Sequence, residues 1–255
     1  MIDGPAPKWK AVSAFLERRV GSGRSSEMGR RSGQKGKAVN VMNKQHETPA
    51  VLRPELRSTT VGPPRVAPRQ DVPVDVYELL RKIEGGEPIR GVMLTLAHNP
   101  RVAKRFAVLV GGLLAKGTLP ARARELVILR MGWRCGARYE FSEHTKLALD
   151  AGLTLQEIAR LTQSAEQAAF DGDDAVLVAL VDDLYDANTL SESTWERLRE
   201  RWQVPEIIEL LVLAGTYWTV SGVLNTVRVA LEDGASGWPP GVAPPGLTPQ
   251  RLATG

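Results

Sequence analysis

The hydrophobic positions of this chain recur with a helical period from Asp75 to about Gly234, and no segment of useful length alternates as a strand would. Glycine, proline and capping residues in this region mark helix ends rather than strand turns. The pattern therefore predicts an all-α fold of about eight helices in a single domain. The expected segments are nine when the two short ones at 90–98 and 154–163 are counted separately, and they lie at about residues 75–84, 90–98, 100–116, 120–135, 137–151, 154–163, 173–187, 191–203 and 205–233.

Several helix starts can be read from single residues. Thr154 and Glu157 form a T-x-x-E capping box, in which each side chain accepts a hydrogen bond from a backbone N–H of the first turn. Pro100 and Pro120 suit the first turn of a helix, where no backbone N–H is needed. Further helix caps are expected at Asp75, Asp171 and Ser191.

Composition divides the chain into four parts. Residues 1–48 are rich in Gly, Ser, Lys and Arg and have little periodic apolar content, which predicts a disordered basic tail. Residues 49–74 contain six prolines and are expected to form an extended strap over the domain surface. The helical domain is expected at residues 75–234, followed by a C-terminal loop at 235–255.

Charge is unevenly distributed between the tail and the domain. Fourteen Lys and Arg against five acidic residues give residues 1–70 a net charge of +9, whereas the whole chain carries +4, so the remainder carries −5. The basic isoelectric point thus describes the tail, and a nucleic-acid partner is not expected for the domain. A solvated extension, or residues upstream of a natural start such as Met42, explains the tail more simply than contact with nucleic acid or an acidic membrane.

The chain contains a single cysteine, Cys135, which excludes an internal disulfide and a Cys-x-x-Cys redox pair. We expect this thiol to be a small buried hydrophobe. The longest apolar run, residues 207–220, is short and is interrupted by Glu209, and the N-terminus lacks the apolar core of a secretory signal. These features predict a cytoplasmic protein without a membrane partner.

Candidate chemistry is concentrated between Glu125 and His144. Residues four apart on a helix share a face, so Glu140 and His144 should form a neighbouring acid/base pair. Glu125 lies on the preceding helix, which can fold back against that pair. A surface pair would contribute only about 0.2–0.5 kcal/mol, whereas a buried pair has shifted pKa values and suits proton transfer. The alternative for Glu125 is a structural ion pair with Arg122, Arg124 or Arg130.

Other side chains near this segment are candidates for substrate binding. Trp133 and Tyr139 flank it and could form pocket walls, and the Tyr139 hydroxyl could donate to a substrate oxygen, although ordinary core aromatics are more common. Arg138, or Arg130, could hold an anionic group. No metal ligation is predicted, because the chain shows neither a Glu-x-x-His nor a His-x-x-x-His signature.

The region 112–152 resembles the carboxymuconolactone decarboxylase family, which also contains the alkylhydroperoxidase D proteins. The thiol motif of that family is Cys-x-x-Cys-x-x-x-His, with a glutamate fifteen residues before the second cysteine. When the motif is aligned by its histidine to His144, the two cysteines fall on Ala137 and Glu140, and the glutamate falls on Glu125. The outer members of the motif are present and both thiols are missing.

The resemblance implies an all-helical domain of the alkylhydroperoxidase D type that assembles as a homo-oligomer, as a trimer or hexamer. Since peroxide reduction in the thiol branch needs a reactive thiolate and a resolving partner, the leading hypothesis is a cofactor-free general acid/base enzyme. It would decarboxylate or isomerise a small carboxylated or lactone substrate, with His144 and Glu140 as base and acid and Glu125 orienting them. A thiol-dependent hydroperoxidase using Cys135, and a non-catalytic helical oligomer, are the alternatives.

Overall fold

The computed structural model describes residues 62–235, 237–240 and 242, and no strand occurs among them. The predicted all-α fold is therefore confirmed. The helices are α2 (Val74–Glu84), α3 (Gly91–Leu96), α4 (Pro100–Ala115), α5 (Ala121–Arg134), α6 (Arg138–Asp150), α7 (Leu155–Arg160), α8 (Ala165–Ala168), α9 (Gly172–Ala187), α10 (Glu192–Arg201) and α11 (Val204–Val227). The four-residue helix α8 was not predicted.

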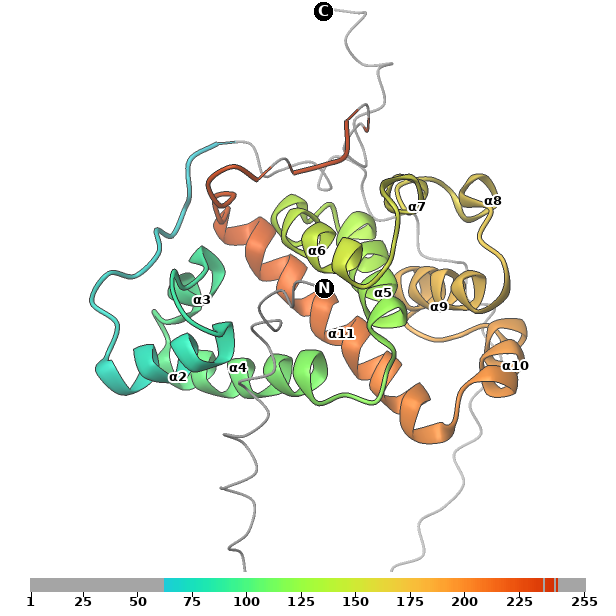
Figure 1. Ribbon diagram of the computed structural model, residues 1–255, viewed down its shortest axis with the longest axis horizontal. Helices are drawn as coiled ribbons and strands as arrows, with labels where there is room; N and C mark the ends of the chain where they lie inside the picture. The colour runs from blue at the N-terminus through green and yellow to red at the C-terminus, as the bar shows by residue number, and fades with distance from the viewer. Residues whose placement is uncertain (1–61, 236, 241, 243–255) are drawn as a thin grey trace, which may run out of the picture.

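Helix α11 runs diagonally through the middle of the molecule, with α2, α3 and α4 on one side and α5 to α10 on the other (Figure 1). The apolar core has two parts. One joins α5 and α6 to α9, α10 and α11, and the other joins α2, α3 and α4 to the C-terminal half of α11. The first turn of α6 contributes to both parts, because Phe141 packs into the first and Tyr139 into the second. This turn therefore lies at the junction of the two halves.

Most helix starts follow the sequence signals. The capping box of Thr154 and Glu157 is present, and the Ser191 hydroxyl accepts from the Thr194 backbone N–H. One expected cap is wrong and another is right in position only. Pro73 is the N-cap of α2, so Asp75 lies inside the first turn and pairs with Lys104. Asp171 is the N-cap of α9, as expected, but its side chain makes no capping hydrogen bond.

The long helix α11 ends earlier than predicted. Arg228 adopts the left-handed conformation, with φ of 56°, and terminates the helix six residues before Gly234. The following segment turns back instead, and the Glu232 carboxylate accepts hydrogen bonds from the Gly91 backbone N–H and the Tyr139 hydroxyl. Tertiary hydrogen bonds thus override the apolar periodicity that continues past Val227.

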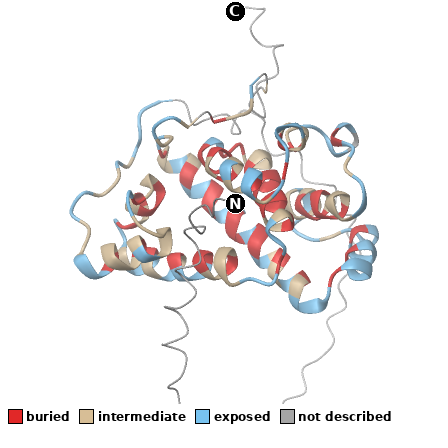
Figure 2. Ribbon diagram, viewed as in Figure 1, coloured by how far each residue is buried: buried red, intermediate tan, exposed pale blue. Residues whose placement is uncertain are grey.

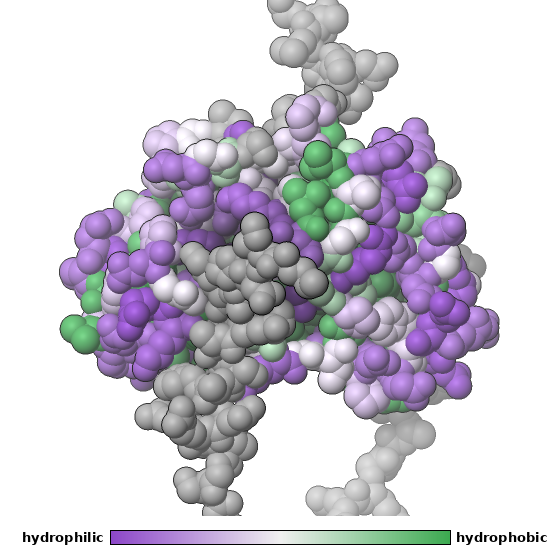
Figure 3. Space-filling model, viewed as in Figure 1, coloured by the Kyte–Doolittle hydropathy of each residue, from purple (hydrophilic) through white to green (hydrophobic). Residues whose placement is uncertain are grey.

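Helix α11 is long and apolar enough to cross a membrane by length and composition, which the shorter apolar run read from the sequence did not indicate. Half of its most apolar window is buried inside the protein, and core helices commonly have the same composition. Buried and exposed positions alternate along its length (Figure 2). The face seen in Figure 3 is largely hydrophilic, with smaller hydrophobic areas.

Residues 62–73 form no helix. The Arg65 backbone N–H donates to the Val227 carbonyl at 2.8 Å, and Arg69 Nη1 donates to the Ala97 carbonyl at 3.0 Å, so this segment lies against the ends of α11 and α3. The predicted tail at residues 1–48, the start of the strap at 49–61 and residues 243–255 of the C-terminal loop lie outside the described residues.

Candidate active site

Helices α5 and α6 bring the candidate residues together. They are joined by a short turn in which Gly136 has φ of 64°, a left-handed conformation that residues with a Cβ rarely adopt. The turn reverses the chain, so α6 packs along α5. Glu125, one turn into α5, then faces His144, which lies in the middle of α6.

The His144 ring lies between two carboxylates. Its Nδ1 is 2.6 Å from Glu125 Oε2, and its Nε2 is 3.0 Å from Glu140 Oε1. All three residues are buried, with exposed fractions of 0% for Glu125, 2% for His144 and 6% for Glu140. Because an ionised carboxylate accepts hydrogen bonds and cannot donate, contacts at both ring nitrogens require a proton on each nitrogen. The geometry therefore favours an imidazolium held between two carboxylates.

The electrostatics agree with this protonation state. Burial lowers the pKa of His144, but the charges and hydrogen bonds of Glu125 and Glu140 outweigh burial and raise the pKa to about 9. Burial raises the pKa of Glu125, yet the His144 charge, helped by Arg124, brings that pKa below its ordinary value. Arg124 Nε donates to Glu125 Oε1 at 3.0 Å. The ion pair expected as the structural alternative for Glu125 thus exists alongside the contact with His144.

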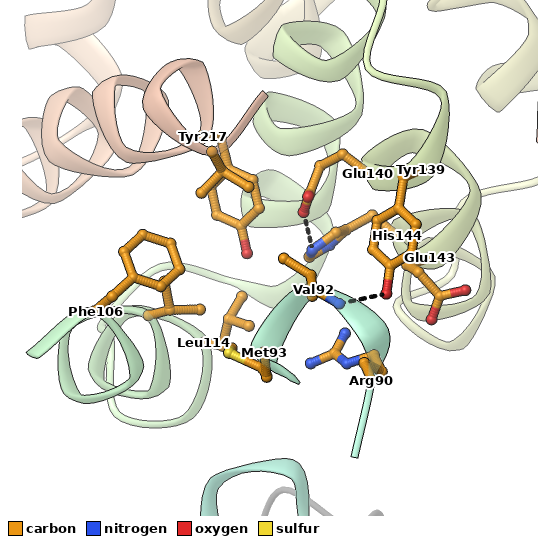
Figure 4. A pocket seen from close by; sticks show the side chains of 12 residues that line it. Arg90, Val92, Met93, Phe106, Leu114, Tyr139, Glu140, Glu143, His144 and Tyr217 are labelled. Carbon is orange, nitrogen blue, oxygen red and sulfur yellow. Dashed lines mark hydrogen bonds and ion pairs between the residues drawn. The ribbon is translucent and has the colours of Figure 1, made fainter. Parts of the chain in front are cut away.

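Glu140 and His144 face a cavity of about 30 Å³ between α6, α11, α4 and α3 (Figure 4). Its walls are mostly apolar, and its polar lining comes from Arg90, Tyr139, Glu140, Glu143, His144 and Tyr217. In this shape the cavity holds about one water molecule. Three side chains at the edge of the cavity are only partly buried: Arg90, Phe106 and Leu114. A ligand larger than water would enter by displacing these side chains.

Tyr139 is the one predicted substrate-binding residue that lines the cavity, and its hydroxyl donates to Glu232. The structure does not bring Trp133 and Arg138 to this cavity. Trp133 packs edge-on against Trp238 with ring centroids 5.2 Å apart, and Arg138 is exposed beside Gly237. Arg138 lies six residues before His144, which separates the two side chains by about 120° around the helix, so Arg138 points away from the cavity.

The other residues considered from the sequence also lie away from the cavity. Arg130 is buried and binds Asp182 and the Leu161 carbonyl, so its role is structural. Cys135 lies at the end of α5, where its Sγ is 3.7 Å from Met131 Sδ, and it does not line the cavity.

Sequence reasoning missed three polar cavity residues, which are Glu143 on α6 and the more distant Arg90 and Tyr217. Arg90 precedes α3 and is fixed by Glu84 through two hydrogen bonds, of 2.5 Å from Nε and 2.8 Å from Nη2. Tyr217 lies on α11 and packs edge-on against the His144 ring with centroids 5.0 Å apart. Both are more than thirty residues from the nearest member of the Glu125–His144 segment, and no local motif marks them. An arginine before a short helix and a tyrosine in an apolar helix look ordinary in the sequence.

Comparisons with known proteins agree with the fold. Residues 100–182, from α4 into α9, match the model of the Carboxymuconolactone decarboxylase family, so the resemblance seen in the sequence is confirmed for this region. None of the curated proteins matches the chain.

Solved structures share the helical architecture at low sequence identity. An uncharacterized peroxidase-related protein from Silicibacter sp. TM1040 superimposes with a TM-score of 0.58 and 14% identity, over 70% of this chain and 94% of that chain. The debrominase Bmp8 gives a TM-score of 0.52 and 17% identity, over 66% of this chain and 92% of that chain. A protein of unknown function from Agrobacterium tumefaciens, described as a candidate antioxidant defence protein AhpD, gives a TM-score of 0.49 and 20% identity. The superposition covers 53% of this chain and 93% of that chain. At these identities the similarity concerns the fold alone.

Proposed function

We propose that this chain is a cofactor-free general acid/base enzyme that decarboxylates or isomerises a small carboxylated or lactone substrate. The observation that carries the proposal is the buried Glu125–His144–Glu140 cluster, which opens onto a cavity with apolar walls. Acid/base groups suit catalysis when they are held within hydrogen-bond distance of each other and of the substrate. The fold and the family match are consistent with an enzyme but do not identify the reaction.

The raised pKa of His144 reverses the roles that the sequence suggested. An imidazolium at neutral pH is an acid, so His144 is assigned as the proton donor and the Glu140 carboxylate as the base. Glu125 holds His144 in its charged form and orients the ring, as a carboxylate partner does for other catalytic histidines.

Deuterium exchange tests this function without knowledge of the natural substrate. The protein is incubated in D₂O with α-angelica lactone and with a panel of small keto acids, and NMR follows deuterium uptake, isomerisation and loss of the carboxyl group. We expect at least one compound to react faster than in buffer. The Cys135→Ser variant should keep that rate within about twofold, because the thiol lies outside the cavity. Absence of any reaction, or peroxide consumption that Cys135→Ser abolishes, would favour the alternatives.

The proposal includes a homo-oligomer, for which α11 provides a surface. Ile208 and Val212, one turn apart, are 56% and 43% exposed, and Trp218 is 58% exposed. Such apolar exposure along one helix is costly in water and is typical of an interface. Sedimentation velocity should show a trimer or larger assembly that Ile208→Glu with Val212→Glu dissociates. A wild-type monomer at micromolar concentration would contradict this part of the proposal.

A further inference from the structure

Two hydrogen-bond donors in the cavity have unused capacity. Arg90 binds Glu84 through Nε and Nη2, and within the described residues its Nη1 has no hydrogen-bond partner. The Tyr217 hydroxyl likewise has no partner there, although Tyr217 is only 2% exposed. Figure 4 shows this hydroxyl pointing into the cavity, with the Arg90 guanidinium below His144. A donor that lines a cavity and is not used by the protein can donate to a ligand oxygen.

Both donors are fixed before any ligand binds. Arg90 donates two hydrogen bonds to Glu84, whose side chain is 5% exposed, and these hold the guanidinium in one orientation. Tyr217 is held by its edge-on packing against His144. Burial, with the nearby negative charges of Glu140 and Glu125, raises the pKa of Tyr217 well above 10, so its hydroxyl keeps its proton. Preorganised donors of this kind stabilise charge that develops on oxygen during a reaction.

The charged groups around the cavity leave no spare positive charge before a ligand enters, and the Glu232 carboxylate, which accepts from the Tyr139 hydroxyl, makes no ion pair within the described residues. The cations Arg90, Arg124 and His144 face the carboxylates Glu84, Glu125 and Glu140, and Glu143 at the edge pairs with Lys146 at 3.3 Å. An anionic substrate would add an uncompensated charge to this arrangement. An uncharged carbonyl compound would not, because proton transfer to Glu140 only moves a negative charge from that carboxylate to the substrate oxygen.

We propose that Arg90 and Tyr217 form an oxyanion-binding pair, and that the substrate is an uncharged carbonyl compound with an acidic C–H, such as a small unsaturated lactone. This inference rests on the proposed function. Of the two substrate classes named there, carboxylated compounds and lactones, it selects the lactones. The carbonyl oxygen accepts from Arg90 Nη1 and the Tyr217 hydroxyl. Glu140 takes the proton from the adjacent carbon, the C–H electron pair forms the enolate C=C bond, and the negative charge passes to the oxygen. Return of a proton from His144 or protonated Glu140 to another carbon completes an isomerisation.

The Tyr217→Phe variant gives the sharpest test. It removes only a hydroxyl that has no hydrogen-bond partner among the described residues, so a purely structural role predicts unchanged stability and activity. With α-angelica lactone, we expect Tyr217→Phe and Arg90→Lys each to lower kcat for isomerisation about 10²-fold, with a smaller change in KM, as when an oxyanion donor is removed elsewhere. Arg90→Lys keeps a positive charge beside Glu84. Matched controls are Tyr185→Phe, which keeps the ring that Arg134 stacks on, and the exposed Arg101→Met.

A binding measurement separates this inference from the proposed function. 4-Nitrophenolate mimics an enolate, and its absorbance near 400 nm reports ionisation of the bound phenol without turnover. The wild type should take up neutral 4-nitrophenol and hold it as the phenolate, with its proton on Glu140, so that the net charge of the site is unchanged. Tyr217→Phe and Arg90→Lys should each weaken binding at least tenfold, relative to the controls. Equal affinity in wild type and variants, or no binding to wild type, overturns the oxyanion pair even if lactone turnover is found. If the wild type does not turn over the lactone but the two variants bind the phenolate more weakly, lactone isomerisation is rejected and the oxyanion site is retained.

Discussion

Replacing His144 with Ala, or Glu140 with Gln, is expected to lower turnover of a reactive lactone by about 10²–10⁴ while the protein stays folded. This range is typical for the loss of a positioned acid or base. Glu140→Gln keeps the size of the side chain and its oxygen near His144, but an amide does not take up a proton at neutral pH. The initial rate of deuterium uptake by NMR, at substrate concentrations above and below KM, separates loss of chemistry from loss of binding.

The control for this pair is Glu143→Gln, which changes another carboxylate at the cavity edge whose side chain makes no hydrogen bond or ion pair with the His144 ring among the described residues. We expect it to retain most of the activity. Wild-type rates in both His144→Ala and Glu140→Gln, with normal circular dichroism spectra, would remove these residues from the mechanism.

Replacing Glu125 with Gln is expected to lower the free energy of unfolding at pH 7 by on the order of 3 kcal/mol, because one member of a buried charged cluster is removed. The pH dependence should change as well. The pKa of His144 is raised from 6.5 to about 9, so its stabilising contribution is complete below pH 6.5 and is lost as the pH rises through 9. In wild type this loss amounts to roughly 3 kcal/mol. In Glu125→Gln only the Glu140 contact remains, and the loss should be much smaller.

Urea unfolding at pH 6, 7, 8 and 9 measures both effects. Glu125 acts in the opposite pH range, since its lowered pKa gives stability that is lost only as the pH falls below about 4.5. Asp186→Asn is the matched control, because that carboxylate pairs with Arg134 at the surface and is 60% exposed. The Asp186→Asn substitution should lower the free energy of unfolding by less than about 1 kcal/mol. It should leave the dependence of that free energy on pH between 6 and 9 unchanged. An identical slope in wild type and Glu125→Gln would show that Glu125 does not set the charge of His144.

The local parts of the site could be predicted from the sequence. The spacing of four residues between Glu140 and His144 fixes their contact on any helix, and Gly136 marks the turn that folds α6 back on α5. The register that places Glu125 opposite His144 came from the family spacing, because helical periodicity alone does not set the offset between two helices.

The remaining parts depend on tertiary contacts that the sequence pattern does not contain. Arg90 and Tyr217 reach the cavity because α11 passes between the two halves of the domain. Trp133 is covered by Trp238, from a segment without periodicity. Helix α11 stops at Val227, and the chain then turns back so that the Glu232 carboxylate accepts a hydrogen bond from the Gly91 backbone N–H. These two residues are 141 positions apart in the sequence.

The most direct test of the account is an NMR titration of the His144 imidazole, in protein labelled with ¹⁵N and ¹³C at histidine and assigned with His144→Gln. The account predicts signals of a doubly protonated ring that persist to a pH of about 9 in wild type, with a lower titration midpoint in Glu125→Gln. A ring that titrates at or below pH 6.5 in wild type, or with the same midpoint in both proteins, would contradict an imidazolium held between Glu125 and Glu140.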